Sequence, residues 1–344
     1  MKPKILKKRD SARFLDKLLR EYEVFAPVKR EDLVVFGRIH SGKEAFLDYM
    51  NSKMPPKEML FPQLEILFTY TSIDDPSKIE TPPSAGKPRL LFGTRPCDAR
   101  NSLLLDKVFD GEQYKDTYYR DRRAPLVVVG IGCIQPCPTC FCTSVGGGPF
   151  SREGLDILLI DIGDDYVAQV VSDRGKKLLE RRGLEDAGAD KLSLVKKVIR
   201  DAEASMTSEV KIDGLAEKLA EIYDDPIWGL LTEKCLNCGV CTYLCPTCHC
   251  FDIVDEARDS GGKRIRIWDT CQFPLFTLQA SGANPRPTNK ERLRQRFMHK
   301  FKYFLDNYGQ IGCVGCGRCV RECPVNVDIR QVLTVLSNRL EVAP

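Results

Sequence analysis

The sequence contains few of the residues on which hydrolytic enzymes depend. Among its 344 residues only three are histidine, and His40, His249 and His299 form no pattern with a nucleophile and an acid. The glycine run at 146–148 lacks the Lys-Ser/Thr that a phosphate-binding loop requires, and no Gly-x-Gly-x-x-Gly of a dinucleotide-binding fold is present. The sequence therefore gives no support for hydrolysis or for a dinucleotide site.

Long apolar stretches are also missing. No segment approaches the ~20 consecutive apolar residues of a membrane-spanning helix, and residues 1–10 are charged and lack the apolar core of a secretion signal. We therefore expect a cytoplasmic protein with no membrane span. Because thiols rarely form disulfides in that reducing compartment, the sixteen cysteines of the chain need another explanation.

Half of these cysteines belong to one motif that occurs twice. The spacing Cys-x2-Cys-x2-Cys-x3-Cys-Pro is found at 235–246 and again at 313–324. It is typical of [4Fe–4S] ligands in two-cluster ferredoxins, where the fourth cysteine of each run binds the other cluster. We therefore predict two [4Fe–4S] clusters, one on Cys235, Cys238, Cys241 and Cys323, and one on Cys313, Cys316, Cys319 and Cys245.

Zinc is the main alternative for closely spaced cysteines. A structural zinc ion takes four ligands, usually from two pairs, and an asymmetric run of four thiols that occurs twice suits zinc poorly. Clusters would also change the net charge, which is formally +4 with every cysteine counted as neutral. Eight thiolates and two cluster cores bring it near zero, so the basic composition is no argument for nucleic acid.

Five further cysteines occur in the N-terminal half, at position 97 and within 133–142. Cys97 follows a strand predicted at 89–94, and Cys133 follows a strand predicted at 125–130. Both thiols would lie at the carboxyl ends of parallel strands, where open α/β sheets bind ligands. We predict a third iron–sulfur cluster on Cys97, Cys133, Cys140 and Cys142, with zinc or buried free thiols as alternatives.

Four thiols remain without an assigned role, namely Cys137, Cys248, Cys250 and Cys271. Together they would supply the ligands of a possible fourth cluster, although small buried cysteines often only pack. His249 lies between two of them in the sequence, and we interpret it as a hydrogen-bonded or surface imidazole and not as a ligand.

The apolar pattern predicts an α+β protein with two domains. Residues 1–200 are expected to form an α/β domain that contains a β-α-β unit at 89–130 and hairpins at 24–39 and 156–171. Residues 201–344 are expected to form a mainly α-helical, ferredoxin-like domain with two clusters. The 67 residues between Cys245 and Cys313 are too many for a compact ferredoxin hairpin.

The segment 290–303 is unusually basic. Its apolar residues recur at helical spacing, with arginine and lysine on the remaining positions. We interpret it as an amphipathic helix with a solvated basic face. A docking surface and a positive field that favours the reduced form of a cluster are the alternatives.

Several segments resemble one known family, which comprises the iron–sulfur beta subunits of cytosolic [NiFe] (sulf)hydrogenases and the corresponding iron–sulfur subunits of anaerobic sulfite reductases. The resemblance extends from about residue 20 to about residue 335. The segments that carry it are 57–65, 93–98, 139–144, 235–252, 266–271, 299–303 and 312–324.

This resemblance implies an electron-transfer subunit of a multisubunit redox complex. Its clusters would relay electrons between two partners, of which one binds flavin and NAD(P) and the other is a catalytic redox subunit. Related subunits also accompany heterodisulfide reductase-like partners, so the resemblance does not specify the complex. The alternative from another class is a sulfur or disulfide reductase, in which Cys248, Cys250 and Cys271 act beside a cluster.

Overall fold

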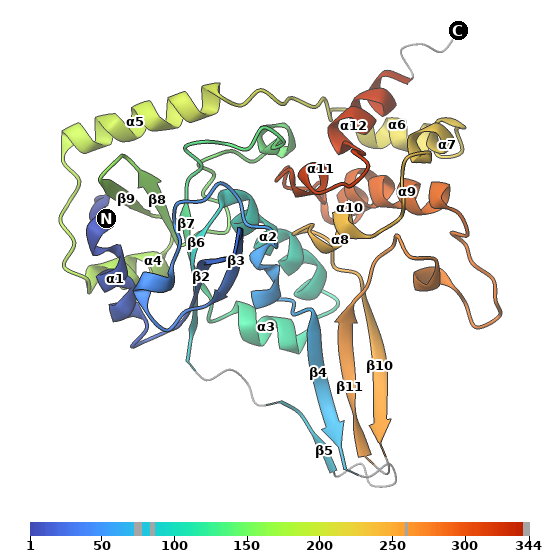
Figure 1. The fold of residues 1–344 in the computed structure, drawn as a ribbon, viewed down its shortest axis with the longest axis horizontal. Coiled ribbons are helices and arrows are strands. Elements are labelled where there is room, and N and C mark those ends of the chain that lie inside the picture. Colours follow the sequence, from blue (N-terminus) through green and yellow to red (C-terminus); the bar gives the residue numbers. More distant parts are fainter. Residues whose placement is uncertain (72–77, 83–86, 259–260, 340–344) are drawn as a thin grey trace.

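The computed structural model describes residues 1–71, 78–82, 87–258 and 261–339, and its centre is a seven-stranded mixed sheet (Figure 1). Neighbouring pairs among β2, β6, β7 and β8 run parallel, and β1, β3 and β9 pair antiparallel. In spatial order the strands are β1 (Lys4–Lys7), β9 (Asp165–Val170), β8 (Ile157–Asp161), β7 (Val127–Ile131), β6 (Arg89–Thr94), β2 (Glu23–Arg30) and β3 (Leu33–Arg38).

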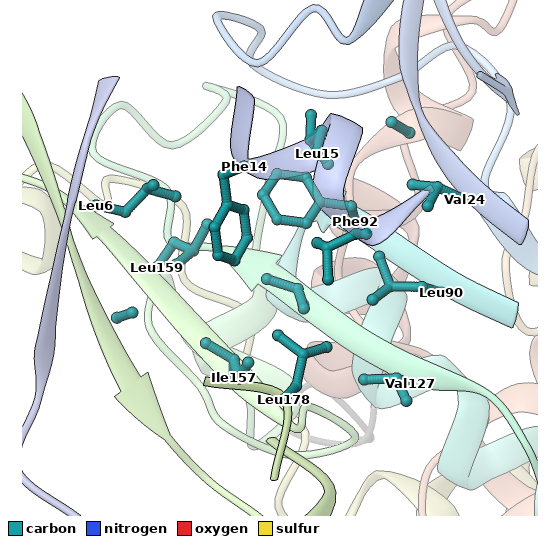
Figure 2. Close-up of a cluster of buried hydrophobic side chains, with 14 of the residues drawn as sticks. Leu6, Phe14, Leu15, Val24, Leu90, Phe92, Val127, Ile157, Leu159 and Leu178 are labelled. Atoms are coloured by element: carbon teal, nitrogen blue, oxygen red, sulfur yellow. The ribbon is translucent and has the colours of Figure 1, made fainter. Parts of the chain in front are cut away.

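Helices cover both faces of this sheet, because alternate residues of its buried strands point to opposite sides. One face packs against α1 (Ser11–Leu18) and α4 (Asp173–Glu180) in the apolar cluster of Figure 2. The other face packs against α2 (Pro96–Phe109), α3 (Thr117–Arg123) and α5 (Ala189–Ala204). The sheet is thus the middle layer of an α/β sandwich.

The predicted α+β class is confirmed, as are the local elements of the N-terminal half. The β-α-β unit consists of β6, α2 and β7, with the two strands parallel and adjacent. The two hairpins are β2–β3 and β8–β9.

A second sheet joins distant parts of the chain. Its order is β10 (Phe251–Arg258), β11 (Gly261–Trp268), β4 (Leu64–Tyr70) and β5 (Ile79–Glu80), and it projects from the body as an arm (Figure 1). The β10–β11 hairpin lies within the part of the chain that was predicted to be mainly helical and was not itself predicted. The expected division between residues 200 and 201 falls inside α5, and strand pairing crosses it.

The remaining C-terminal residues form short helices around an apolar core that also includes Phe141 and Val145. These helices are α6 (Leu215–Glu221), α7 (Ile227–Thr232), α8 (Val240–Tyr243), α9 (Asn289–Met298), a π-helical turn (His299–Tyr303), α10 (Phe304–Tyr308), α11 (Arg318–Arg321) and α12 (Ile329–Asn338). Within the described ranges, no helix is both long and apolar enough to cross a membrane.

Candidate iron–sulfur sites

The first candidate site is a pocket at the surface of the C-terminal helices. Gly239, with φ +75°, turns the chain into α8, and Cys323 follows α11, which packs beside α8. The Cys238 side chain is exposed to solvent. We name this the outer pocket, and the thiols that line it are Cys235, Cys238, Cys241, Cys319 and Cys323.

A second pocket lies deeper between the two cysteine motifs. We name it the inner pocket, and it is lined by Cys245, Cys313, Cys316 and Cys319, together with Arg296 and Lys300. The structure therefore brings together both sets of four thiols that the motif spacing predicts, one set from each crossed pairing. Cys319 contributes to the walls of both pockets, and iron ligation by these thiols stays a prediction.

A third pocket lies at the carboxyl ends of β6 and β7, as predicted for Cys97 and Cys133. We name it the N-terminal pocket, and its thiols are Cys97, Cys133, Cys137, Cys140, Cys142 and, from the C-terminal motif, Cys316. The structure brings together the four thiols predicted for a third cluster and adds Cys137.

The N-terminal and inner pockets are in direct contact. The Phe141 N–H donates to the Gly315 carbonyl at 2.9 Å. Gly315 has φ +62°, and a Cβ built on it would lie only 2.6 Å from the backbone nitrogen of Cys142. Glycine is thus required at 315 both for its dihedral angle and for the close approach of the two backbones.

The three pockets form a continuous row. The N-terminal and inner pockets share Gly315 and Cys316, and the inner and outer pockets share Arg296, Cys319 and Ile329. Neighbouring pockets are thus separated by single residues, and the inner pocket lies between the other two.

The thiols around these pockets do not meet at a single point. A zinc ion holds its sulfur ligands about 2.3 Å away, so the ligands must converge closely. Within the described part of the chain, no three Cys, His, Asp or Glu side chains converge tightly enough to hold a single metal ion.

Buried cations line the inner pocket. Lys300, 4% exposed, has its Nζ 3.3 Å from Cys245 Sγ and donates to Thr247 Oγ1 at 2.7 Å. Arg296, also 4% exposed, has Nη1 3.7 Å from Cys248 Sγ. Among the described residues, neither has a carboxylate oxygen within 4.0 Å. Since a buried cation without a counter-charge is costly, the compensating charge must come from the sulfur side.

This result corrects the interpretation of the basic segment. The helix at 290–303 is confirmed as α9 and the π-helical turn that follows, but its basic face is not solvated throughout. Arg292, Arg296 and Lys300 are buried. Arg296 and Lys300 face Cys248 and Cys245, whereas Arg292 donates to the Arg286 and Pro287 carbonyls.

The electrostatics of these thiols depend on the same cations. Burial raises the pKa of Cys316 to about 11, which disfavours the thiolate that binds metal. Although burial opposes the charge on Lys300, the neighbouring Cys245 and Cys248 thiolates raise its pKa. Cations and thiolates therefore stabilise each other's charged forms.

A third buried cation, Lys57, lies at the other side of this region. Its Nζ donates to the Cys245 and Cys248 carbonyls at 3.0 and 2.8 Å and lies 4.0 Å from the centre of the Trp268 ring. Burial lowers the pKa of Lys57 to about 8. The residue fixes the backbone that carries two cysteines.

The N-terminal pocket has a different charge arrangement. Arg318 is fully buried and donates to both Asp98 oxygens at 2.6 and 2.7 Å, so a carboxylate neutralises it. Arg95 donates to the Gly132 carbonyl at 2.9 Å, while its Nε is buried without a hydrogen-bond partner in the described structure. An unpartnered cationic N–H in this pocket fits an anionic group held by the thiols.

The four remaining thiols lie in two places. Cys137 lines the N-terminal pocket beside Cys140. Cys248, Cys250 and Cys271 lie near one another and near Cys245. A fourth cluster on the remaining thiols stays a prediction.

His249 is hydrogen-bonded, as expected. Its Nδ1 lies 3.0 Å from the Thr247 carbonyl, and burial lowers the pKa of the imidazole to about 4. Lys57, Arg95 and Arg318 were not predicted from the sequence as parts of the sites. Arg95 and Arg318 each lie within two residues of a predicted ligand, and that proximity was the available signal.

The sequence comparisons agree with this geometry. The chain is 32% identical over 328 residues to the beta subunit of sulfhydrogenase 2 from Pyrococcus furiosus, an alignment that covers 93% of this chain and 94% of that protein. The chain belongs to the family of sulfhydrogenase beta subunits. Residues 234–327 match the 4Fe-4S dicluster domain family, and no solved structure matches the chain. The predicted resemblance is confirmed, and this family member is an iron–sulfur protein.

Proposed function

We propose that this family member conducts electrons through three [4Fe–4S] clusters arranged in a row. The observation that carries the proposal is the sharing of wall residues between successive pockets, which leaves each cluster within one side chain of the next. Each cluster accepts and returns single electrons when bound. The order along the row is N-terminal, inner, outer.

The thiols proposed as ligands follow the pocket walls. Cys235, Cys238, Cys241 and Cys323 hold the outer cluster, and Cys245, Cys313, Cys316 and Cys319 hold the inner cluster. The N-terminal cluster is held by Cys97, Cys133, Cys140 and Cys142. Cys137 lies close enough to replace one of these four and is the first substitute to test.

The buried cations support this assignment independently. A [4Fe–4S] cluster with four thiolates carries a negative charge of about two. Such a charge provides the counter-ion that Arg296 and Lys300 lack among the described carboxylates. Neutral thiols would leave both cations uncompensated.

Because the proposed row of clusters has two ends, it implies two partner subunits, one at each end. The family resemblance implies one partner that binds flavin and NAD(P) and one that is a catalytic redox subunit. The matched relative is named as a subunit of a sulfhydrogenase. The exposed Cys238 makes the outer cluster the one that a partner protein approaches most closely from the solvent side.

Metal analysis of the full-length, anaerobically purified protein tests the proposal. Three clusters predict about 12 iron and 12 acid-labile sulfide per chain. About 8 of each would remove the N-terminal cluster from the proposal, and zinc in that pocket would make it structural.

Cys323→Ala tests the crossed ligation. EPR should then show damage to the outer cluster while the signal of the inner cluster persists. Loss of the inner signal alone would show that each motif binds its own cluster. Cys248→Ala is the matched control, because Cys248 is a half-buried thiol outside all three proposed ligand sets.

A second candidate function is reduction of sulfur or disulfide substrates by this chain itself. It is favoured by the neighbouring thiols Cys250 and Cys271, which belong to none of the three pockets described above. Under this alternative, Cys271→Ser abolishes disulfide reduction and leaves the iron content unchanged. Under the electron-transfer proposal, Cys271→Ser leaves cluster-to-cluster transfer intact.

A further inference from the structure

A large cavity opens at the carboxyl edge of the central sheet. Its volume is about 1130 Å³, and it is lined by residues that follow β1, β3, β7 and β8 and by the last turns of α5 with Ser205. The carboxyl edge of a parallel sheet is where ligands bind in open α/β folds. Small-molecule sites typically measure about 300–1,000 Å³, so the cavity can hold an organic ligand.

The cavity abuts the N-terminal pocket. Ile134, Gln135 and Pro136 form part of its wall, directly after Cys133, and Pro136 also lines the N-terminal pocket. Ile134 is 43% exposed although it is apolar. A ligand in the cavity would thus be separated from the N-terminal cluster by one short loop.

The charges of the residues that line the cavity indicate which kind of ligand it can bind. Two lysines and three aspartates line the cavity, and Lys8 is already paired with Asp161 at 2.6 Å. This balance gives no excess positive charge, which a ligand with several phosphates would need. Much of the remaining wall is apolar, including Leu15, Leu47, Ile162 and Val198. The lining therefore suits an uncharged ring system.

We propose that the cavity binds an uncharged, redox-active ring of the quinone or flavin class, which exchanges electrons with the N-terminal cluster. The inference rests on the proposed relay. Reduction of such a ring takes two electrons, delivered singly by the cluster, and two protons from water; oxidation returns both. The ring is supplied either by a free small molecule or by a partner protein that inserts it into the cavity.

Titration of the full-length holoprotein with menadione and riboflavin under anaerobic conditions tests the site. Ser205→Trp fills the cavity from the end of α5, whereas Ser193→Trp places the same side chain on an exposed, non-lining position of that helix. We expect saturable binding that Ser205→Trp weakens at least tenfold and Ser193→Trp leaves unchanged. Bound reduced menadione should give electrons to the clusters, seen as growth of their EPR signal.

Other outcomes distinguish a free ring from one that a partner holds. They also show whether the cavity proposal or the cluster proposal has failed. If neither probe binds, but Ser205→Trp alone lowers at least tenfold the rate of electron transfer from the partner subunit, the ring belongs to the partner. No binding and no rate effect would overturn the cavity site, even with 12 iron atoms per chain. Binding without electron exchange in a chain with only 8 iron atoms would instead refute the N-terminal cluster.

Discussion

Arg318 and Lys300 are both buried cations beside thiol pockets, yet the molecule neutralises them differently. Arg318, next to the N-terminal pocket, forms a two-point ion pair with Asp98. Lys300, next to the inner pocket, meets a cysteine sulfur, a hydroxyl and a carbonyl, and the structure describes no carboxylate beside it. Arg318 is therefore neutralised by a carboxylate of the protein, whereas the negative charge nearest to Lys300 can come only from the thiol side.

Iron removal should produce the largest difference in stability between the helix beside the inner pocket and the central sheet. Without clusters, the buried cations of the inner pocket lose their counter-charge, at a cost of several kcal/mol for each. Hydrogen exchange should show that residues 289–303 lose amide protection in the chelated protein. Strands β6, β7 and β8 should keep theirs, because their core is apolar. Equal protection in the two forms would refute the dependence on iron.

Arg318→Met should destabilise the fold beside the N-terminal pocket. The substitution leaves Asp98 buried without its cation, which costs about 3–5 kcal/mol. Anaerobic guanidinium unfolding measures this loss, and the double variant Arg318→Met/Asp98→Leu should recover most of it. Arg321→Met removes a partly exposed pair with Glu322 and should change the free energy of unfolding by about 0–1 kcal/mol.

Gly315→Ala should separate the N-terminal and inner pockets. Gly315 and Gly309 both have positive φ, so alanine brings similar dihedral strain at each. Only at Gly315 does the added Cβ collide with another backbone, and we expect about 1–3 kcal/mol of extra destabilisation. Electron transfer between the two clusters should slow in this variant alone. Identical unfolding curves for the two variants would show that the backbones separate without cost.

Lys300→Met should have the smallest effect on folding and a clear effect on potential. Removing one positive charge about 5 Å from the inner cluster is worth about 3 kcal/mol at an effective dielectric constant near 20, which lowers its reduction potential on the order of 100 mV. An EPR-monitored redox titration measures the shift. Lys302→Met, which removes a more exposed charge paired with Asp306, should leave the potential unchanged. A shift of the outer cluster instead would reassign Cys245.

Local patterns predicted the local structure well. The strands at β6 and β7 were predictable because continuous apolar runs flank a helix, and the thiol sets were predictable because motif spacing constrains them. The β10–β11 hairpin was missed because its outer strand is largely exposed and its partner β4 is distant in sequence. Ile265 pairs with Ile66, which lies 199 residues earlier.

Burial of charge was the other failure of sequence reasoning. Helical periodicity correctly predicted a helix over 290–303 but assigned its basic residues to solvent. That assignment holds when the surroundings are neutral, and it fails here because the facing loops carry thiols. Arg296 and Lys300 are buried and face the sulfur atoms of Cys248 and Cys245.

The pairing of β4 with β11 also determines when this protein can mature during synthesis. At about 5–20 residues per second, the ribosome adds the partner of Ile66 some 10–40 s after Ile66 itself. Until then β4 has an open edge toward β11, and the N-terminal thiol pocket lacks the wall that Gly315 and Cys316 provide. Iron delivered to a nascent chain would therefore meet unfinished sites. We expect cluster insertion to follow release from the ribosome and to proceed on the completed chain.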